Sequence, residues 1–273
     1  MSRPLTIKPI LRWAGGKSKI VQYLIDFLPD DIAERRYVEP FLGAASLFLT
    51  VQPENSIISD LNAHLMNCYK CVAEKPKLVY MYVRQHAART NESYYYKVRE
   101  VYNNSHFSAA QAARFIYLNK TCFNGIFRVN LKGVFNVPYG HKEPPALPTE
   151  SHLIELSKLL ARAQMMTGSY TEILSEAKQG DFFYLDPPYP PLNGTSFFQH
   201  YTPDRFSSAD QQKLANKISE IDRAGSRFLL SNADIPLIRS LYRQYNIRNM
   251  NVRRWVSSKS IKHNVSELII TNY

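Results

Sequence analysis

The chain has 273 residues, 45% of them hydrophobic and 21% charged, which is ordinary for a soluble globular protein and enough for one domain with a sizeable insertion. Thirty-four basic residues against 23 acidic ones give a net charge of +11, which favours a polyanionic partner, although a basic enzyme without one also fits. Three cysteines, no signal-peptide layout and no apolar stretch longer than residues 41–51 argue against a disulfide framework, secretion and a membrane span, so we expect a cytoplasmic protein.

A pair of glycines precedes the first predicted helix, at about 18–28. Gly15 and Gly16 allow the backbone to pass close to a ligand, Trp13 offers a flat face, and Lys17 supplies a point charge. A Gly-Gly-Lys sequence at a helix start could hold a phosphate or a carboxylate, but its spacing is not that of a P-loop. A glycine turn with a solvated lysine fits this segment equally well.

Residues 37–50 predict a strand, a tight turn and a helix. Gly43 lies at the turn, and the small residues that follow it allow the helix to pack closely on the strand. The glycine pattern of dinucleotide-binding proteins is absent, which argues against a nicotinamide oxidoreductase. A second strand, 56–60, ends at Asp60, which could bind ribose hydroxyls or cap the next helix.

Residues 61–120 look helical and basic, with clustered tyrosines that are more typical of packing than of base stacking. Cys68 and Cys71 form a lone C-x-x-C that we interpret as helix residues, not as a redox or zinc site. Segments 126–130 and 134–137 predict a β-hairpin rich in Asn and Arg. These side chains can read base edges, and a β-ribbon fits a major groove, but a polar surface hairpin is the alternative.

A linker at 141–148 contains three prolines and predicts a return to the first domain. It is followed by a predicted helix at 151–163 and a strand region at 169–175. Further along, a polar aromatic loop at 193–201 could close over a site, and a helix is predicted at 207–223. The last elements are a strand at 228–232 and two closing strands around a basic turn within residues 252–273.

The most informative stretch is the apolar run 182–185, which predicts a buried strand. It stops at Asp186, Pro187, Pro188 and Tyr189, because prolines cannot continue a central strand. In open α/β sheets ligands bind at this end of the strands. The carboxylate and a free backbone carbonyl can accept hydrogen bonds from an amine, and an exposed tyrosine ring can stack. This combination predicts a pocket for a flat polar group.

Five motifs occur together in one order: Trp-Ala-Gly-Gly-Lys (13–17), Glu-Pro-Phe-Leu-Gly-Ala-Ala-Ser (39–46), the strand-end Asp60, Asn-Gly-x-x-Arg-x-Asn to Phe-Asn-Val-Pro-Tyr-Gly (124–140), and Asp-Pro-Pro-Tyr (186–189). With them the chain resembles the Dam-type DNA adenine-N6 methyltransferases (D12 class, alpha group) over nearly its whole length. One departure is Ala45, where the family's Phe-x-Gly-x-Gly has its second glycine. We expect this change to be mild, because it falls at the start of a helix.

The resemblance implies a Rossmann-like α/β sheet with an inserted, mainly helical target-recognition domain that carries the β-hairpin. The catalytic domain would comprise residues 1–60 and 150–273, and the target-recognition domain residues 61–149. The methyl donor would be S-adenosylmethionine and the partner double-stranded DNA, with no metal, no membrane and a monomer in solution. The implied cofactor contacts are Trp13, Lys17, Phe41, Gly43, Asp60 and Asp186.

By the same resemblance, Arg12, Asn124, Ile126 and Arg128 would read a short palindrome, GATC in the best-known members. Asp186 and the Pro187 carbonyl would hold the adenine amine of a base flipped out of the duplex, and Tyr189 would stack on it. The resemblance implies a prokaryotic or phage enzyme, either paired with a restriction enzyme or acting alone.

Three alternatives remain open at this point. The chain could recognise another sequence or act on RNA. A protein-glutamine methyltransferase would carry Asn-Pro-Pro-Tyr, so Asp186 favours a nucleobase amine. A non-catalytic nucleic-acid-binding protein on the same fold would be expected to lack Trp13, Lys17 or Asp186, and all three are present.

Overall fold

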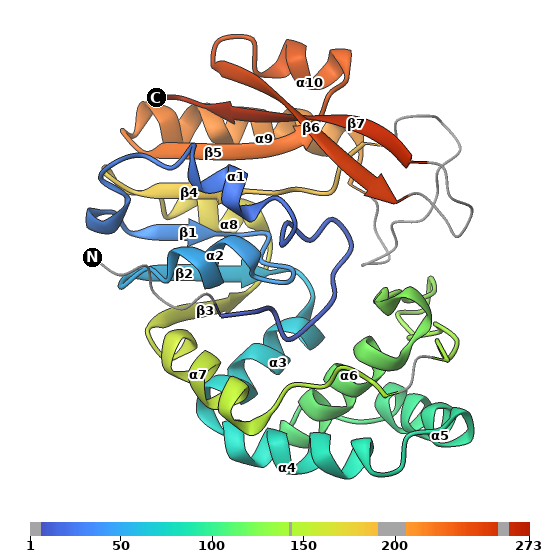
Figure 1. The fold of residues 1–273 in the computed structure, drawn as a ribbon. Coiled ribbons are helices and arrows are strands. Elements are labelled where there is room, and N and C mark those ends of the chain that lie inside the picture. Colours follow the sequence, from blue (N-terminus) through green and yellow to red (C-terminus); the bar gives the residue numbers. More distant parts are fainter. Residues whose placement is uncertain (1–6, 142–143, 191–205, 256–261) are drawn as a thin grey trace.

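The computed structural model describes residues 7–141, 144–190, 206–255 and 262–273, and it is built around a seven-stranded sheet (Figure 1). The strand order is β3-β2-β1-β4-β5-β7-β6. The strands are β1 Tyr37–Glu39, β2 Ser56–Asp60, β3 Ala163–Thr167, β4 Phe182–Leu185, β5 Arg227–Ala233, β6 Asn246–Trp255 and β7 Lys262–Thr271. Strands β1 to β5 run parallel, and β7 lies antiparallel to both β5 and β6. The expected α/β methyltransferase sheet is confirmed.

Helices cover both faces of the sheet. The α-helices of the described residues are α1 Val21–Ile25, α2 Ser46–Val51, α3 Ala63–Glu74, α4 Pro76–Ala87, α5 Glu92–Asn103, α6 Ala109–Thr121, α7 Glu150–Leu160, α8 Tyr170–Ser175, α9 Ser208–Arg223 and α10 Pro236–Leu241. Side chains alternate along each strand, so Phe182 and Tyr184 share a core with α1, α2, α3 and α7. Phe183 and Leu185 point the other way, into a core with α8, α9 and α10. Burial on both faces explains why β4 is apolar at every position.

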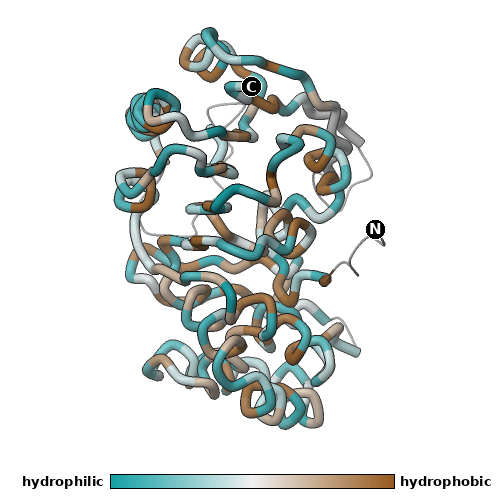
Figure 2. Tube along the Cα trace, turned by 90° about the vertical axis from the view of Figure 1, so that its left-hand side faces the viewer, coloured by the Kyte–Doolittle hydropathy of each residue, from teal (hydrophilic) through white to brown (hydrophobic). Residues whose placement is uncertain are grey.

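Helices α3 to α6 form the lower part of the molecule in Figure 1, between β2 and α7 in the chain. Asn62, Asn91 and Ser108 cap α3, α5 and α6 by accepting a backbone N–H, which sets where each helix starts. Tyr95 and Tyr102 are buried, so the packing interpretation of the tyrosine cluster holds for them. Figure 2 shows hydrophilic and hydrophobic residues alternating around these helices, as amphipathic packing requires.

The prediction placed one strand of the sheet at the wrong residues. Residues 169–175, expected as a strand region, form α8, whose start is capped by the Ser169 side chain. The strand β3 comes immediately before it and replaces the end of a helix that was predicted to reach 163. Because β3 is an edge strand with partly exposed side chains, it lacks the continuous apolar run that identified its neighbours. The first helix, α1, is also shorter than predicted.

The hairpin expected at 126–137 is reduced to a turn with few ladder contacts. Within the described residues, bridges join only Val129 to Phe135 and Cys122 to Tyr139. The Asn130 side chain accepts the backbone N–H groups of Lys132 and Val134, while the Asn130 N–H donates to the Val134 carbonyl and the Asn136 N–H to the Arg128 carbonyl, so side-chain bonds at the turn add to a short antiparallel backbone pairing. We call residues 122–140 the 122–140 loop.

The remaining predictions along the chain agree with the structure where it describes them, except that the first closing strand, β6, begins at Asn246 and not within residues 252–273. Helix α9 is capped by Ser207, and its side chain and that of Asp210 form a reciprocal capping box. Cys68 and Cys71 lie within α3, and both thiols are free. The loop predicted at 193–201 and the basic turn between the closing strands lie outside the described residues. No helix in the described part of the chain is long and apolar enough to cross a membrane.

Candidate active site

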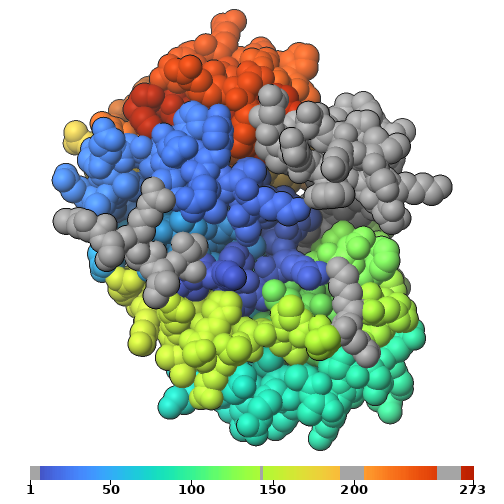
Figure 3. Space-filling model, viewed as in Figure 1, coloured from blue at the N-terminus to red at the C-terminus, as the bar shows by residue number. Residues whose placement is uncertain are grey.

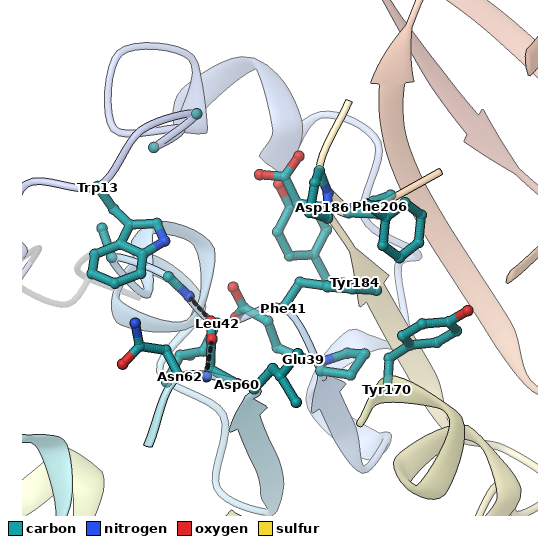
Figure 4. Close-up of a pocket in the computed structure, with 18 of the residues that line it drawn as sticks. Trp13, Glu39, Phe41, Leu42, Asp60, Asn62, Tyr170, Tyr184, Asp186 and Phe206 are labelled. Atoms are coloured by element: carbon teal, nitrogen blue, oxygen red, sulfur yellow. Dashed lines mark hydrogen bonds between the residues drawn. The ribbon is translucent and has the colours of Figure 1, made fainter. Parts of the chain in front are cut away.

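A cavity of about 360 Å³ opens at the carboxyl ends of β1, β2, β3 and β4. It lies where the strand order reverses, since β1 pairs with β2 on one side and with β4 on the other. Figure 4 shows Trp13 and Asp60 on one side of the cavity and Asp186 and Phe206 on the other. The sequence therefore predicted the location of the site from the strand that ends at Asp186.

An ion pair between Lys17 and Asp186 lies at the centre of this site. The Lys17 Nζ atom is 2.7 Å from both carboxylate oxygens of Asp186, and it also donates to the Gly15 carbonyl at 2.9 Å. Ser231 on β5 donates its hydroxyl to Asp186 Oδ1 at 2.7 Å. Lys17 is only 5% exposed, so the alternative of a solvated lysine is wrong. Removing either partner would leave a largely buried charge, which typically costs about 3–5 kcal/mol.

The ring of Tyr189 lies below this ion pair. The Lys17 ammonium is 4.8 Å from the ring centroid, and the Tyr189 hydroxyl donates to Glu267 Oε2 on β7 at 2.9 Å. Burial, together with the carboxylates of Asp186 and Glu267, raises the pKa of the Tyr189 phenol well above its usual value. The ring is half-buried and anchored, whereas the sequence suggested an exposed one.

Glu39 is a buried acid that sequence reasoning missed as a functional candidate. It ends β1, lines the cavity and is 2% exposed, and its Oε2 accepts the Tyr37 hydroxyl at 2.7 Å. Burial raises the pKa of Glu39 to about 8, and the charge on Asp186 acts in the same direction. The available signal was an acidic residue inside an otherwise apolar strand.

Asp60 holds the turn after β1 in place. Its carboxylate accepts the Gly43 N–H at 3.0 Å and the Asn62 N–H at 2.9 Å (Figure 4). Burial raises the pKa of Asp60, and these backbone donors oppose the shift. Asn62, not Asp60, is the N-cap of α3, so the capping alternative for Asp60 is wrong. Asp60 keeps the strand-end position that was expected of a ribose-binding acid.

Two residues of this turn have left-handed backbone conformations. Gly43 has a φ of +47°, and a Cβ there would lie 2.8 Å from Trp13 Cδ1, so only glycine allows the indole to pack this closely. Ala45 has a φ of 59° just before α2. An alanine in this conformation is strained by about 1–2 kcal/mol. The substitution is therefore less mild than its expected place inside a helix implied.

An aromatic group forms the end of the cavity beyond the β1 turn. The Phe41 and Tyr170 rings stack with centroids 5.2 Å apart, and Phe206 meets Phe41 edge-on at 6.2 Å. Phe41 was predicted as a site residue, whereas Tyr170 and Phe206 were not. Both come from the chain's later elements, and only the fold brings them next to Phe41.

The N-terminal segment joins the cavity to the helical part of the molecule. The Asn119 side chain at the end of α6 accepts the Arg12 N–H at 2.7 Å and donates to the Arg12 carbonyl at 2.8 Å. The neighbouring Trp13 ring stacks on Phe127, with centroids 5.6 Å apart and planes 13° from parallel. Figure 3 shows the dark blue N-terminal residues lying against green residues of the helical part.

The remaining predicted recognition residues lie on the 122–140 loop, outside the lining of the cavity. Arg12 packs against Gly125 of this loop, so the structure brings Arg12 next to the predicted recognition segment. Asn124 is exposed with a φ of 56°, and Ile126 is half-buried. Arg128 Nε donates to the Asn136 side chain at 3.1 Å. Among the residues the structure describes, no cluster of His, Cys, Asp and Glu could hold a metal ion.

Comparison with known proteins gives one family match over most of the chain. Residues 13–256 match the model of the family described as D12 class N6 adenine-specific DNA methyltransferase. The chain is 38% identical to the type II methyltransferase M.MjaIII of Methanocaldococcus jannaschii, over 98% of this chain and 100% of that protein. It is 32% identical to the type II methyltransferase M1.LlaDCHI of Lactococcus lactis, over 98% and 96% of the two chains. It is 34% identical to a DNA adenine methylase of Serratia marcescens, over 96% and 97%.

Proposed function

The chain belongs to the D12 class of N6 adenine-specific DNA methyltransferases, and from this premise we propose that it methylates adenine within GATC in double-stranded DNA. As a member of this class it transfers a methyl group from S-adenosylmethionine to the N6 atom of adenine in DNA. The observation that carries the proposal is the Asp186 carboxylate, held by Lys17 and Ser231 where β4 ends and the cavity opens.

The chemistry of the cavity fits the methyl donor. Glu39 is protonated near neutral pH, but the other acidic side chains of the lining still outnumber its ammonium groups, which suits a ligand with a sulfonium and an amino group: Asp60, Asp186 and Asp210 against Lys17 and Lys213. Phe41, Asp60 and Trp13 would hold the nucleoside, with Asp60 accepting ribose hydroxyls. Lys17 and Asp186 would hold the amino-acid end. The bound donor supplies an electrophilic methyl group.

The adenine amine is a poor nucleophile, because its lone pair is delocalised into the ring. Asp186 and the Pro187 carbonyl would accept its two N–H groups and thereby orient the nitrogen. Positioning of this kind can lower a barrier by several kcal/mol. Asp186 already accepts two hydrogen-bond donors, so it acts by orienting the amine and needs no strong basicity. Tyr189 would contact the face of the adenine.

The target base must leave the duplex to reach this cavity, at a cost of about a few kcal/mol. We propose that residues 61–149 form the target-recognition domain, and that residues 1–60 and 150–273 form the catalytic domain around it. We propose that the active unit is a monomer, as the resemblance to the family implies. Sedimentation of the protein on its DNA tests this stoichiometry.

The GATC assignment rests on the resemblance to well-known members and on the placement of Arg12 beside the 122–140 loop. Plasmid DNA treated with the purified protein and labelled donor should become resistant to restriction enzymes that are blocked by N6-methyladenine in GATC. Labelled DNA that stays sensitive to them would indicate another recognition sequence, the main alternative. Labelling of duplex RNA in place of DNA would support the RNA alternative.

Arg128 is expected to read a guanine through its two terminal nitrogens, a contact worth about 1–3 kcal/mol of discrimination. The Arg128→Ala variant should therefore relax sequence choice more than it slows methylation of the best site. Rates on a set of duplexes that differ by one base pair would measure this. An equal loss on every duplex would instead mean that Arg128 contacts a phosphate.

A further inference from the structure

The turn that follows β4 has fewer free backbone torsions than an ordinary loop. The rings of Pro187 and Pro188 fix the φ angles of both residues. Asp186 and Pro187 each precede a proline, which restricts their ψ angles to extended values. The ψ angle of Pro188 is therefore the first torsion in this turn that proline chemistry leaves open. It sets the direction of the Pro188 carbonyl and, with it, the path of the chain into Tyr189.

A buried glutamine donates a hydrogen bond to the Pro188 carbonyl, whose direction depends on this torsion. Gln211 on α9 donates from Nε2 to the Pro188 carbonyl at 3.0 Å, and its side chain is fully buried. Since a carbonyl oxygen can only accept a hydrogen bond, the amide nitrogen of Gln211 must face it. Rotation about the Pro188 ψ angle would break this bond and leave a buried donor without a partner.

A second buried amide orients the first. Asn232 on β5 donates from Nδ2 to Gln211 Oε1 at 3.1 Å, and the Asn232 Oδ1 atom accepts the Ala233 N–H at 2.8 Å. Asn232 is also fully buried. The neighbouring core residues are apolar, among them Leu214, Ile218 and Phe228. If packing were the only requirement, leucine would fill the space of the two amides without needing hydrogen-bond partners.

We propose that Gln211, oriented by Asn232, is a positioning residue for methyl transfer. It fixes the ψ angle of Pro188 and so holds the Tyr189 ring where it meets the extruded adenine. Glu267 holds the hydroxyl at the other end of the same ring. This inference rests on the proposed role of residues 186–189 in binding adenine. The Lys17–Asp186 pair has its own partners, so cofactor binding does not depend on Gln211.

Two variants of Gln211 test the inference. Gln211→Met keeps the length of the side chain and removes the donor. Gln211→Glu keeps the acceptor for Asn232 and places a carboxyl oxygen against the Pro188 carbonyl; because burial raises the pKa of a carboxyl group, this variant is assayed at alkaline pH, where the group is ionised and cannot donate. Both variants should lower kcat on duplex DNA at least tenfold, while the dissociation constant of S-adenosylmethionine stays within twofold. The control Gln212→Met makes the same change one residue later, on the exposed side of α9, and should keep the wild-type kcat.

A fluorescent duplex separates positioning from general destabilisation. The probe carries 2-aminopurine at the adenine that the wild-type protein methylates, and an aromatic ring stacked on this base quenches its emission. With Gln211→Met the emission of the complex should rise, because Tyr189 no longer holds its position. Asn232→Leu should also lower kcat. The kcat of the double variant should equal that of Gln211→Met alone, because both residues act through one contact.

Three results would overturn the inference. They are an unchanged kcat in both Gln211 variants, a loss of kcat matched by an equal loss of cofactor affinity, and emission that stays at the wild-type level. If Gln211→Met fails to fold, Gln211→Glu and Asn232→Leu decide the matter by the same measurements. The proposed function fails separately, if the wild-type protein labels no adenine in any duplex.

Discussion

Lys17 and Asp186 lie 169 residues apart in the chain, yet each satisfies the other's charge. Lys17 also lies over the Tyr189 ring, and Asp186 also accepts the Ser231 hydroxyl of β5. The ion pair therefore connects the end of β4, the tyrosine ring and β5. This geometry explains the structural role of the Gly-Gly-Lys segment, which places the Lys17 ammonium against Asp186. Gly15 contributes its carbonyl to the same ammonium, and the glycines let Lys17 turn inward.

Lys17→Ala should weaken S-adenosylmethionine binding at least tenfold, because Asp186 would lose its counter-charge and its fixed orientation. Titration calorimetry of the variant without DNA measures this. Lys19→Ala, which changes an exposed lysine two residues later, is the matched control and should bind the donor as the wild type does. An unchanged dissociation constant in Lys17→Ala would argue against its place in the cofactor site.

Glu39 gives the protein a specific dependence of stability on pH. Its pKa is about 8 in the folded protein against 4.5 when exposed, so unfolding releases a proton between these values. Stability from this residue is therefore complete below pH 4.5, falls as the pH rises toward 8, and then levels off. The slope is at most about 1.4 kcal/mol per pH unit.

The Glu39→Gln variant should lose this dependence, because the amide does not titrate. Urea unfolding at pH 5, 6, 7 and 8 would show the wild-type protein losing stability relative to the variant by roughly a few kcal/mol across that range. All other titrating groups are shared, so the difference between the two proteins isolates Glu39. Parallel curves for the two proteins would contradict the raised pKa.

At the scale of elements, the segment that carries Arg12 and Trp13 links two functions. Arg12 is held by two hydrogen bonds to the Asn119 side chain of α6, and Trp13 lines the cavity and stacks on Phe127 of the 122–140 loop. The position of this loop and the shape of the cavity are thus fixed by one short stretch of backbone.

Phe127→Leu should weaken S-adenosylmethionine binding severalfold in the absence of DNA, because Trp13 loses its stacked ring while the core keeps most of its volume. Fluorescence titration with the cofactor measures the effect. Leu131→Ala changes an exposed residue of the same loop and should leave cofactor affinity unchanged. Equal affinities in Phe127→Leu and wild type would mean that the stack does not support the cavity.

Several elements could be predicted because their sequence pattern is local. The strands β2, β4 and β5 are apolar runs that end at polar residues. Helix α9 begins directly after Ser207, a residue type that favours helix starts. Strand β3 could not be predicted in the same way, because an edge strand needs no continuous apolar face. The hairpin predicted within the 122–140 loop is present as isolated antiparallel bridges and not as regular strands, because asparagine side chains take some of the hydrogen bonds of its ladder.

The residues of the site likewise fall into those that their local sequence pattern predicts and those that only the fold reveals. Trp13, Lys17, Phe41, Gly43, Asp60 and Asp186 all lie at the predicted cavity and belong to recognisable motifs. Gln211, Glu267 and Tyr170 sit in ordinary helix or strand patterns, and their importance comes from which distant residues they meet. No property of their own segments distinguishes them, so only the packed fold reveals them.

For the whole molecule, the excess of basic residues predicts strongly salt-dependent binding to DNA. A net charge of +11 favours the release of counterions from the phosphate backbone. Affinity for duplex DNA should fall by about a thousandfold or more between 50 and 200 mM salt, as expected of a protein that neutralises about six to ten phosphates. Anisotropy titrations with a matched and an unrelated duplex would measure it. A flat response for both duplexes would contradict the electrostatic account.

Strands β2 and β3 are neighbours in the sheet, although about a hundred residues separate Ile57 from its partner Gln164. Closing a flexible loop of that length costs about 4 kcal/mol of chain entropy. The intervening helices reduce this penalty, because α3 starts just after β2, α7 ends just before β3, and Leu65 and Leu156 share one core. The contact between α3 and α7 therefore brings the ends of β2 and β3 together, and so the helices between the two strands help to form the sheet.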